Sequence, residues 1–216
     1  LEEIISHGLM LGADFVEIFL ENTDNLSVLV EEDFITSVSP SFGKGAGIRI
    51  FKDNRDGFVS TNDLSRNGLI SSITQAIQML DINSTCIKRF EGLENIRNYS
   101  TNKDNWLATV PTINEIGEKL LTTTDFLNKE EKINVRKGSY ARNWQKVIIA
   151  SSDGTFAKDI RLHQTVGLNV IALDRQYRSS GSKRFGSSDS PNDFKNWNHE
   201  EAANEVLESS MNMLYA

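Results

Sequence analysis

The feature of this sequence that most constrains its fold is a set of three glycines at alternate positions, Gly43, Gly45 and Gly47. They lead into the branched and aromatic residues 48–51, which are typical of a β-strand. A turn-rich cluster and a second strand-like run follow over residues 53–61, so the segment predicts a β-hairpin. Because side chains alternate across a strand, one face of this hairpin is bare, and we expect another backbone or a large side chain to pack closely there.

These glycines do not predict a nucleotide site. A dinucleotide-binding loop carries its glycines after a strand and at the start of a helix, where the helix N-terminus faces the pyrophosphate. Here the glycines precede a strand. No Gly-Lys-Ser or Gly-Lys-Thr triplet follows them, so the phosphate-binding loop of nucleotide hydrolases is excluded as well.

The spacing of apolar residues predicts a first α+β unit over residues 1–80. A helix is expected from Leu1 to near Gly12, and a second helix, capped by Asp63 or Ser65, is expected to end near residue 80. Between the helices we expect about five short antiparallel strands, at residues 15–21, 26–32, 34–39, 48–51 and 58–61. This order of helix, meander and helix predicts helices on one face of a curved sheet.

A second unit is predicted over residues 112–216, after a polar connection at residues 81–111 that lacks periodicity. It opens with the capping box of Thr112 and Glu115, and Asn198 is expected to cap its last helix. The strands expected between these helices cover residues 133–140, 146–151 and 160–170, followed by a turn and a basic loop or edge at residues 174–186. The predicted class is α+β: two units of antiparallel sheet with helices packed on one face.

The charge balance and the hydropathy pattern exclude several classes of protein. The chain has 23 basic and 30 acidic residues, a net charge of −7, which argues against a large nucleic-acid footprint. No apolar run approaches the roughly 18–20 residues that span a bilayer, and no signal peptide is visible. The single cysteine excludes an internal disulfide and suits a reducing compartment.

No complete active site can be read from the residue types. The histidines, His7, His163 and His199, are too far apart for a local ligand pair, and no second histidine follows His199 one turn later. Cys86 lies in the irregular connection without a catalytic context, so we interpret it as a bystander thiol. Residues 151–154 (Ser-Ser-Asp-Gly) predict a turn that ends a strand and not a nucleophile elbow. We therefore assign no catalytic residue and no metal ligand.

The most basic stretch is formed by Arg175, Arg178, Lys183 and Arg184. Guanidinium and ammonium groups in this density could hold a carboxylate terminus or an acidic partner. A solvated hairpin is the simpler interpretation, because charged edges also protect sheets from aggregation.

Several segments of the chain resemble one family in order and spacing. The first two resemble the amino-terminal domain of the TldD/PmbA proteins, a metalloprotease family once called modulators of DNA gyrase: GADFVEIFLENTDNLSVLVEEDFITSV and GAGIRIFKDNRDGFVSTNDLS. Two later segments are similar to the central domain of that family, and to its TldD branch more than its PmbA branch: IIASSDGTFAKDIRLHQTVGLNVIAL and SGSKRFG. The likeness covers almost the whole chain and is weakest over residues 81–111.

The resemblance implies a cytoplasmic zinc-dependent peptidase that cuts unfolded or small peptides. Members of the family work as homodimers or as heterodimers with a PmbA-like partner, and they enclose a chamber. The family's zinc ligands lie on a His-Glu-x-x-x-His helix of a carboxy-terminal metal-binding domain, which we expect beyond Ala216. No catalytic residue is carried over, and we expect this chain to hold no cofactor and to be the non-catalytic amino-terminal and central part.

The resemblance also suggests where a peptide substrate would lie. We expect contacts at the bare face formed by Gly43, Gly45 and Gly47, where an extended peptide could add as a strand, and at Arg178 and Arg184. Nucleic acid and membrane are not expected as partners. The alternative is a stand-alone protein-interaction module, a gyrase-modulator-type adaptor without enzymatic activity.

Overall fold

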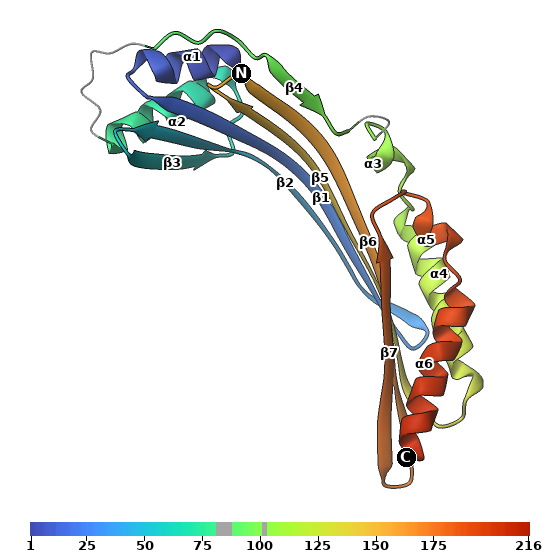
Figure 1. Cartoon of the computed structure of the whole chain (residues 1–216). Helices are drawn as coiled ribbons and strands as arrows, with labels where there is room; N and C mark the ends of the chain where they lie inside the picture. The colour runs from blue at the N-terminus through green and yellow to red at the C-terminus, as the bar shows by residue number, and fades with distance from the viewer. Residues whose placement is uncertain (81–87, 101–102) are drawn as a thin grey trace. The chain divides into compact units, whose positions relative to one another are not determined.

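The computed structural model describes residues 1–80, 88–100 and 103–216 of the chain (Figure 1). Its helices are α1 (Glu2–Met10), α2 (Arg66–Met79), α3 (Trp106–Thr109), α4 (Ile113–Phe126), the 3-10 turn η1 (Leu127–Lys129), α5 (Asp193–Asn196) and α6 (His199–Leu214). Its strands are β1 (Phe15–Glu31), β2 (Phe34–Lys52), β3 (Arg55–Thr61), β4 (Asn95–Asn98), β5 (Ile133–Ser151), β6 (Thr155–Asp174) and β7 (Tyr177–Ser187). The predicted α+β class is confirmed.

The seven described strands form one hydrogen-bonded sheet in the order β3-β2-β1-β5-β6-β4, and β7 also pairs with β6. The pairs β2/β3 and β6/β7 are antiparallel. The short strand β4 is the exception, because it runs parallel to the first residues of β6. The antiparallel ladders are joined by tight turns, such as the two-residue turn of Asp53 and Asn54, both of which have positive φ.

The chain divides into two compact units, each built from separate stretches of sequence. Unit 1 comprises Leu1–Thr23, Phe42–Asp104 and Gln145–Ile160, and unit 2 comprises Asp24–Ser41, Asn105–Trp144 and Arg161–Ala216. The strands β1, β2, β5 and β6 contribute residues to both units. The domain limits predicted from the sequence, at residues 80 and 112, would instead divide the chain into consecutive segments. These limits stay a prediction.

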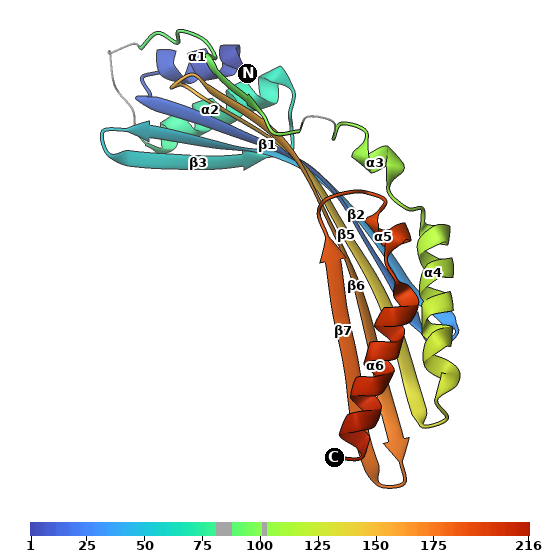
Figure 2. The same cartoon turned by 45° about the vertical axis from the view of Figure 1, so that its right-hand side comes forward.

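Unit 1 has an aliphatic core under α1 and α2, which lie together on one face of its sheet in both Figure 1 and Figure 2. Ile5, Ile18, Ile48 and Ile73 are completely buried in this core. Burial of each such side chain contributes about 1.5–3 kcal/mol. The helix α2 begins where the sequence predicts, because the Ser65 side chain accepts a hydrogen bond from the Gly68 amide at 3.1 Å.

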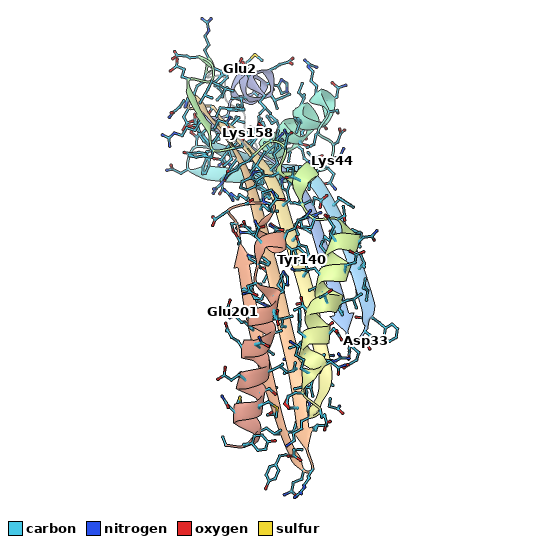
Figure 3. The ribbon with its side chains drawn as sticks, turned by 90° about the vertical axis from the view of Figure 1, so that its right-hand side faces the viewer. Glu2, Asp33, Lys44, Tyr140, Lys158 and Glu201 are labelled. Carbon is cyan, nitrogen blue, oxygen red and sulfur yellow. The ribbon has the colours of Figure 1, made fainter. Side chains whose placement is uncertain are left out.

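Unit 2 has a core that combines aliphatic side chains with aromatic rings, covered by α4 and α6 (Figure 2). Figure 3 shows Tyr140 between these two helices. Its ring lies 4.8 Å from that of Phe194, edge to face, and its hydroxyl donates to Gln164 at 2.8 Å. The predicted capping box of Thr112 and Glu115 is present at the start of α4. Asn198 caps α6 as expected.

The strands are longer than the sequence predicts. The runs at residues 15–21 and 26–32 are parts of the single strand β1, and β2 and β5 likewise each merge two predicted strands. The polar residues between the runs resemble turns, but they are paired across strands. Arg142 of β5 forms an ion pair with Asp24 of β1, and Gln145 donates to Glu21 at 2.5 Å. These long-range partners satisfy polar side chains within a continuous ladder.

The predicted connection at residues 81–111 contains two short elements, β4 and α3. The basic stretch at residues 174–186 is the edge strand β7 and not a loop. Cys86 lies outside the described residues. Among the helices that the structure describes, none is long and apolar enough to cross a bilayer.

Candidate functional site

The histidines are held by hydrogen bonds in separate places. His7 Nε2 lies 3.5 Å from Thr74 Oγ1, and His163 Nδ1 lies 2.6 Å from Ser188 Oγ. Over residues 1–80, 88–100 and 103–216, no group of three or more His, Cys, Asp or Glu side chains could hold a metal ion. The zinc that the family resemblance implies therefore has no fitting set of ligands within these ranges, and we derive no step through a metal.

His199 is the buried histidine of unit 2, at 3% exposure. Its Nε2 lies 3.0 Å from the Phe194 carbonyl oxygen, which can only accept, so Nε2 carries a proton. Its Nδ1 lies 3.1 Å from Thr123 Oγ1. Burial lowers the pKa of His199, because the charged imidazolium would lose its hydration. This histidine is therefore a neutral core residue, and it lies at the first turn of α6.

The Ser-Ser-Asp-Gly segment is a turn between β5 and β6. Asp153 Oδ1 accepts from Ser151 Oγ at 2.6 Å and from the Thr155 amide at 3.0 Å. Gly154 has φ of +89°, which favours glycine. The hydrogen bond from Ser151 lowers the pKa of Asp153. The prediction of a strand-ending turn is confirmed.

The bare face of the hairpin in unit 1 is filled by a neighbouring ring. A Cβ added at Gly47 would lie 3.0 Å from two ring carbons of Phe58 in β3. Beside it, Arg49 lies 4.6 Å above the centre of the Phe51 ring and donates to Asp56 at 3.0 Å. A large side chain thus packs against the glycine, as the sequence indicates for such a face.

The other two glycines are also in contact with polar atoms of unit 1. A Cβ at Gly45 would lie 3.2 Å from Asn62 Oδ1, and a Cβ at Gly43 would lie 2.8 Å from Thr23 Oγ1. Their predicted contact with a substrate peptide stays a prediction. In the structure, the space over all three positions is occupied by side chains of the chain itself.

The predicted arginines lie on β7, in unit 2. Arg178 and Arg184 are six residues apart, which at about 3.3 Å per residue separates them by about 20 Å. They border different hollows: Arg178 lies beside Tyr177 at a hollow of ≈ 440 Å³, whereas Arg184 borders a groove of ≈ 480 Å³. The structure therefore does not bring the two guanidinium groups together.

The groove beside Arg184 lies on the face of the unit 2 sheet that α4 and α6 leave uncovered. A Cβ at Gly138 would point at Leu120 and Thr124 of α4, so the adjacent residues of β5 point to the opposite face. Six residues from β1, β5, β6 and β7 form much of the groove: Leu29, Lys137, Ser139, Gly167, Ser182 and Arg184. Of these, only Arg184 is a residue that the sequence singles out.

The outer edge of β2 in unit 2 is a second exposed surface. The ladder between β2 and β3 covers Ala46 to Lys52, and no described strand lies on the outer side of residues 34–41. Apolar side chains along this edge are exposed, including Phe34 at 72%, Ile35 at 43% and Val38 at 39%. An unpaired edge of this length offers backbone acceptors and, except at Pro40, backbone donors to another extended chain.

The comparison with protein families identifies both halves of the chain. The profile described as PmbA/TldA metallopeptidase domain 1 matches residues 16–80. The profile described as PmbA/TldA metallopeptidase central domain matches residues 88–214. Together the two profiles cover most of the chain.

Individual relatives agree with these matches. A metalloprotease of Methanocaldococcus jannaschii is 23% identical over 180 residues, which are 82% of this chain and 40% of the relative. A Thermotoga maritima protein proposed to modulate a DNA gyrase superposes over 100% of this chain and 48% of its own length, with a TM-score of 0.75 and 15% identity. TldE of Thermococcus kodakarensis superposes over 97% of this chain and 47% of its own length, with a TM-score of 0.73 and 17% identity. The chain thus spans less than half the length of these relatives.

Proposed function

The chain belongs to the PmbA/TldD metallopeptidase family, and from this premise we propose that it is the non-catalytic part of a TldD-like zinc-dependent peptidase. Its role is to form the wall of the substrate chamber and the contacts between subunits. It acts in the cytoplasm, within a homodimer or a heterodimer with a PmbA-like partner. Zinc belongs to the full-length enzyme, and the reaction, substrates and partners of that enzyme are part of this proposal.

The observation that carries the proposal is the unpaired edge of β2 at residues 34–41. A peptidase that acts on unfolded peptides has to hold an extended chain, and a free sheet edge does so through backbone hydrogen bonds. Those backbone hydrogen bonds do not depend on the side chains of the peptide, which suits a broad range of substrates. Exposed Phe34, Ile35 and Val38 provide apolar contact beside the edge.

Binding of a neutral peptide to the 216-residue chain tests this function. The probe is a fluorescein-labelled peptide of Thr, Val, Ser and Gln, capped at both ends. Fluorescence anisotropy measures its binding, and mass spectrometry, with and without added zinc chloride, detects any cleavage. We expect binding without cleavage. Val38→Lys should weaken binding at least tenfold, because a charge on an edge opposes strand pairing.

The matched control is Leu173→Lys, because Leu173 has the same 39% exposure as Val38 but does not lie on the β2 edge. It should leave binding unchanged. Cleavage of the peptide by this chain would contradict a non-catalytic role. Absence of both peptide binding and self-association, measured by sedimentation, would contradict the contact role.

A further inference from the structure

The groove of unit 2 is shaped by a glycine. Gly167 of β6 stands in register with Arg184 of β7. A Cβ at position 167 would lie 2.7 Å from Ser139 Oγ and 3.9 Å from Arg184 Nε. Ser139 Oγ donates to the Gly167 carbonyl oxygen at 3.3 Å, so it lies across the position where a side chain would stand. The absence of a side chain at 167 therefore keeps the floor of the groove low.

The charged groups of the groove leave one cation unneutralised. Lys137 is paired with Glu31 at 3.1 Å, and the neighbouring Lys183 points to the α6 side of β7, where it is paired with Glu205. Within the part of the chain that the structure describes, Arg184 has no carboxylate partner, and its side chain is exposed. An unpaired guanidinium in a chain of net charge −7 is a local positive site on an acidic protein.

The remaining lining is suited to an extended peptide. Ser139 and Ser182 present hydroxyl groups, and Leu29, at 43% exposure, provides an apolar contact. The volume of ≈ 480 Å³ falls within the range of about 300–1,000 Å³ that is usual for small-ligand sites. Convergent polar groups beside one apolar wall match the backbone and side chains of a short peptide segment.

We infer that this groove binds the side-chain carboxylate of Asp or Glu in an extended peptide, through the guanidinium of Arg184. Arg binds carboxylates through two parallel hydrogen bonds, which gives both strength and orientation. A peptide C-terminus is usually captured by backbone amides, whereas the donors of this groove are side chains on paired strands. The inference rests on the proposed function and deepens it, because it assigns a preference for acidic substrates.

The experiment compares two capped fluorescein-labelled peptides that differ only in carboxylates: a Thr/Gln peptide with Leu-Glu-Ser-Glu at its centre and the same peptide with Leu-Gln-Ser-Gln. In about 50 mM salt, where screening is weak, the 216-residue chain should bind the Glu peptide at least tenfold more tightly. Arg184→Gln should abolish this preference. Arg178→Gln, an exposed arginine of the same strand outside the groove, should preserve it.

A second variant tests the shape of the groove and not its charge. Gly167→Val raises the floor while every charged residue stays, so it should also abolish the preference, with circular dichroism as the check of folding. Equal binding of the two peptides, or equal effects of Arg178→Gln and Arg184→Gln, would overturn the inference. Displacement of the Glu peptide by single-stranded DNA at equal concentration would also overturn it.

A Gln peptide with a free C-terminus separates the two sources of a carboxylate. If it binds as tightly as the capped Glu peptide, the site takes a chain terminus and the inference is wrong. The proposed function would be contradicted by a different result. If neither peptide binds, the contact role itself is contradicted. If both peptides bind and only Val38→Lys weakens the binding, the contact role is intact but the groove has no part in it.

Discussion

In unit 1 the strand positions without a side chain are filled by the unit's own residues, whereas in unit 2 such a position leaves a hollow. Phe58 covers Gly47 in the hairpin, whereas the group nearest to the bare position of Gly167 is the small Ser139 hydroxyl. The same alternation along a strand therefore gives scaffold in one unit and a candidate binding groove in the other. A bare strand face predicts a site only where the neighbouring strand does not supply a ring to cover it.

The interiors of the two units differ in a related way. The apolar core of unit 1 consists of aliphatic side chains, and Lys52 is buried beside it, while unit 2 buries the rings of Tyr140 and Phe194 together with a larger set of polar groups that need partners. Arg136, at 6% exposure, donates to Glu32 at 2.8 Å and to Asp33 at 3.2 Å. Such directional contacts fix the turn between β1 and β2. We therefore expect unit 2 to be more sensitive to single substitutions than unit 1.

The largest expected effect is that of Phe194→Ala in unit 2. Phe194 is 1% exposed and packs edge to face against Tyr140 and, at 5.3 Å, against His199. Its removal leaves a cavity among rings that cannot collapse, and we expect a loss of about 3–5 kcal/mol in the free energy of unfolding. Urea denaturation followed by tryptophan fluorescence measures this loss.

Phe58→Ala is the matched truncation in unit 1. The Phe58 ring is 58% exposed, so its removal should cost less than about 1 kcal/mol. Hydrogen exchange should place the lost protection of Phe194→Ala in residues of unit 2. If Phe58→Ala lowers the free energy of unfolding about as much as Phe194→Ala, the covered glycine face is as important to stability as the aromatic core. The contrast between the two units would then be wrong.

A smaller effect is expected from adding one methyl group to a glycine. A Cβ at Gly181 of β7 would lie 2.2 Å from the backbone carbonyl oxygen of Val206 in α6, so the helix has to move. We expect Gly181→Ala to cost about 2–3 kcal/mol. At Gly47 the obstacle is the exposed Phe58 ring, which can turn into solvent, so Gly47→Ala should change stability by about 0.5 kcal/mol or less.

Thermal unfolding of both glycine variants measures this difference. Equal shifts of the midpoint would mean that the contact of β7 with α6 is not rigid. A large loss in Gly47→Ala, with none in Gly181→Ala, would reverse the comparison and make the hairpin of unit 1 the more tightly packed sheet.

The sequence predicts well where local signals decide the structure. The apolar alternation of residues 160–170 identifies the core face of β6, where Leu162, Val166 and Leu168 are buried. Caps are equally local: the side chains of Thr112 and Glu115 are three residues apart and bond each other's backbone. These features need no knowledge of the rest of the chain.

Features that depend on distant partners could not be predicted. The continuity of β1 depends on pairs such as Asp24 with Arg142, which are 118 residues apart. The groove depends on Ser139 and Gly167, from two strands, and on the neutralisation of Lys137 by Glu31 of a third. The basic stretch indicated Arg178 and Arg184 alike, and only the pairing of β6 with β7 separates them. A glycine opposite an arginine is visible only once that register is known.

A pH-dependent effect separates the two units further. Burial lowers the pKa of His199, so the unfolded chain takes up a proton near its ordinary value of about 6.5 while the folded chain does so only at lower pH. The unfolded state then binds more protons, and the stability of unit 2 falls as the pH falls below about 6.5. His199→Gln should reduce this slope between pH 7.5 and 5.5 in urea titrations, with hydrogen exchange locating it in unit 2. An unchanged slope would contradict the assignment to His199.

A small effect is also expected at Asp14 of unit 1, whose acid response lies in a different pH range. The backbone amide of Asp53, at 3.2 Å, together with Lys88 and Lys52, lowers the pKa of Asp14 to about 2. The carboxylate therefore stabilises unit 1 above about pH 4, and this contribution is lost as the pH falls through about 2. Asp14→Asn keeps an acceptor for the Asp53 amide but removes the charge, so the variant should lose less stability between pH 4 and pH 2. At pH 7 the substitution should cost less than about 1 kcal/mol in the free energy of unfolding, because these charges are partly solvated. Hydrogen exchange at pH 5 should then find unit 2 weakened more than unit 1, since the lowered pKa of His199 destabilises unit 2 in that range, whereas the contribution of Asp14 is lost only at lower pH. Equal loss of protection in both units at pH 5 would mean that they unfold as one cooperative body, and the differences drawn between their cores would have no separate effect on stability.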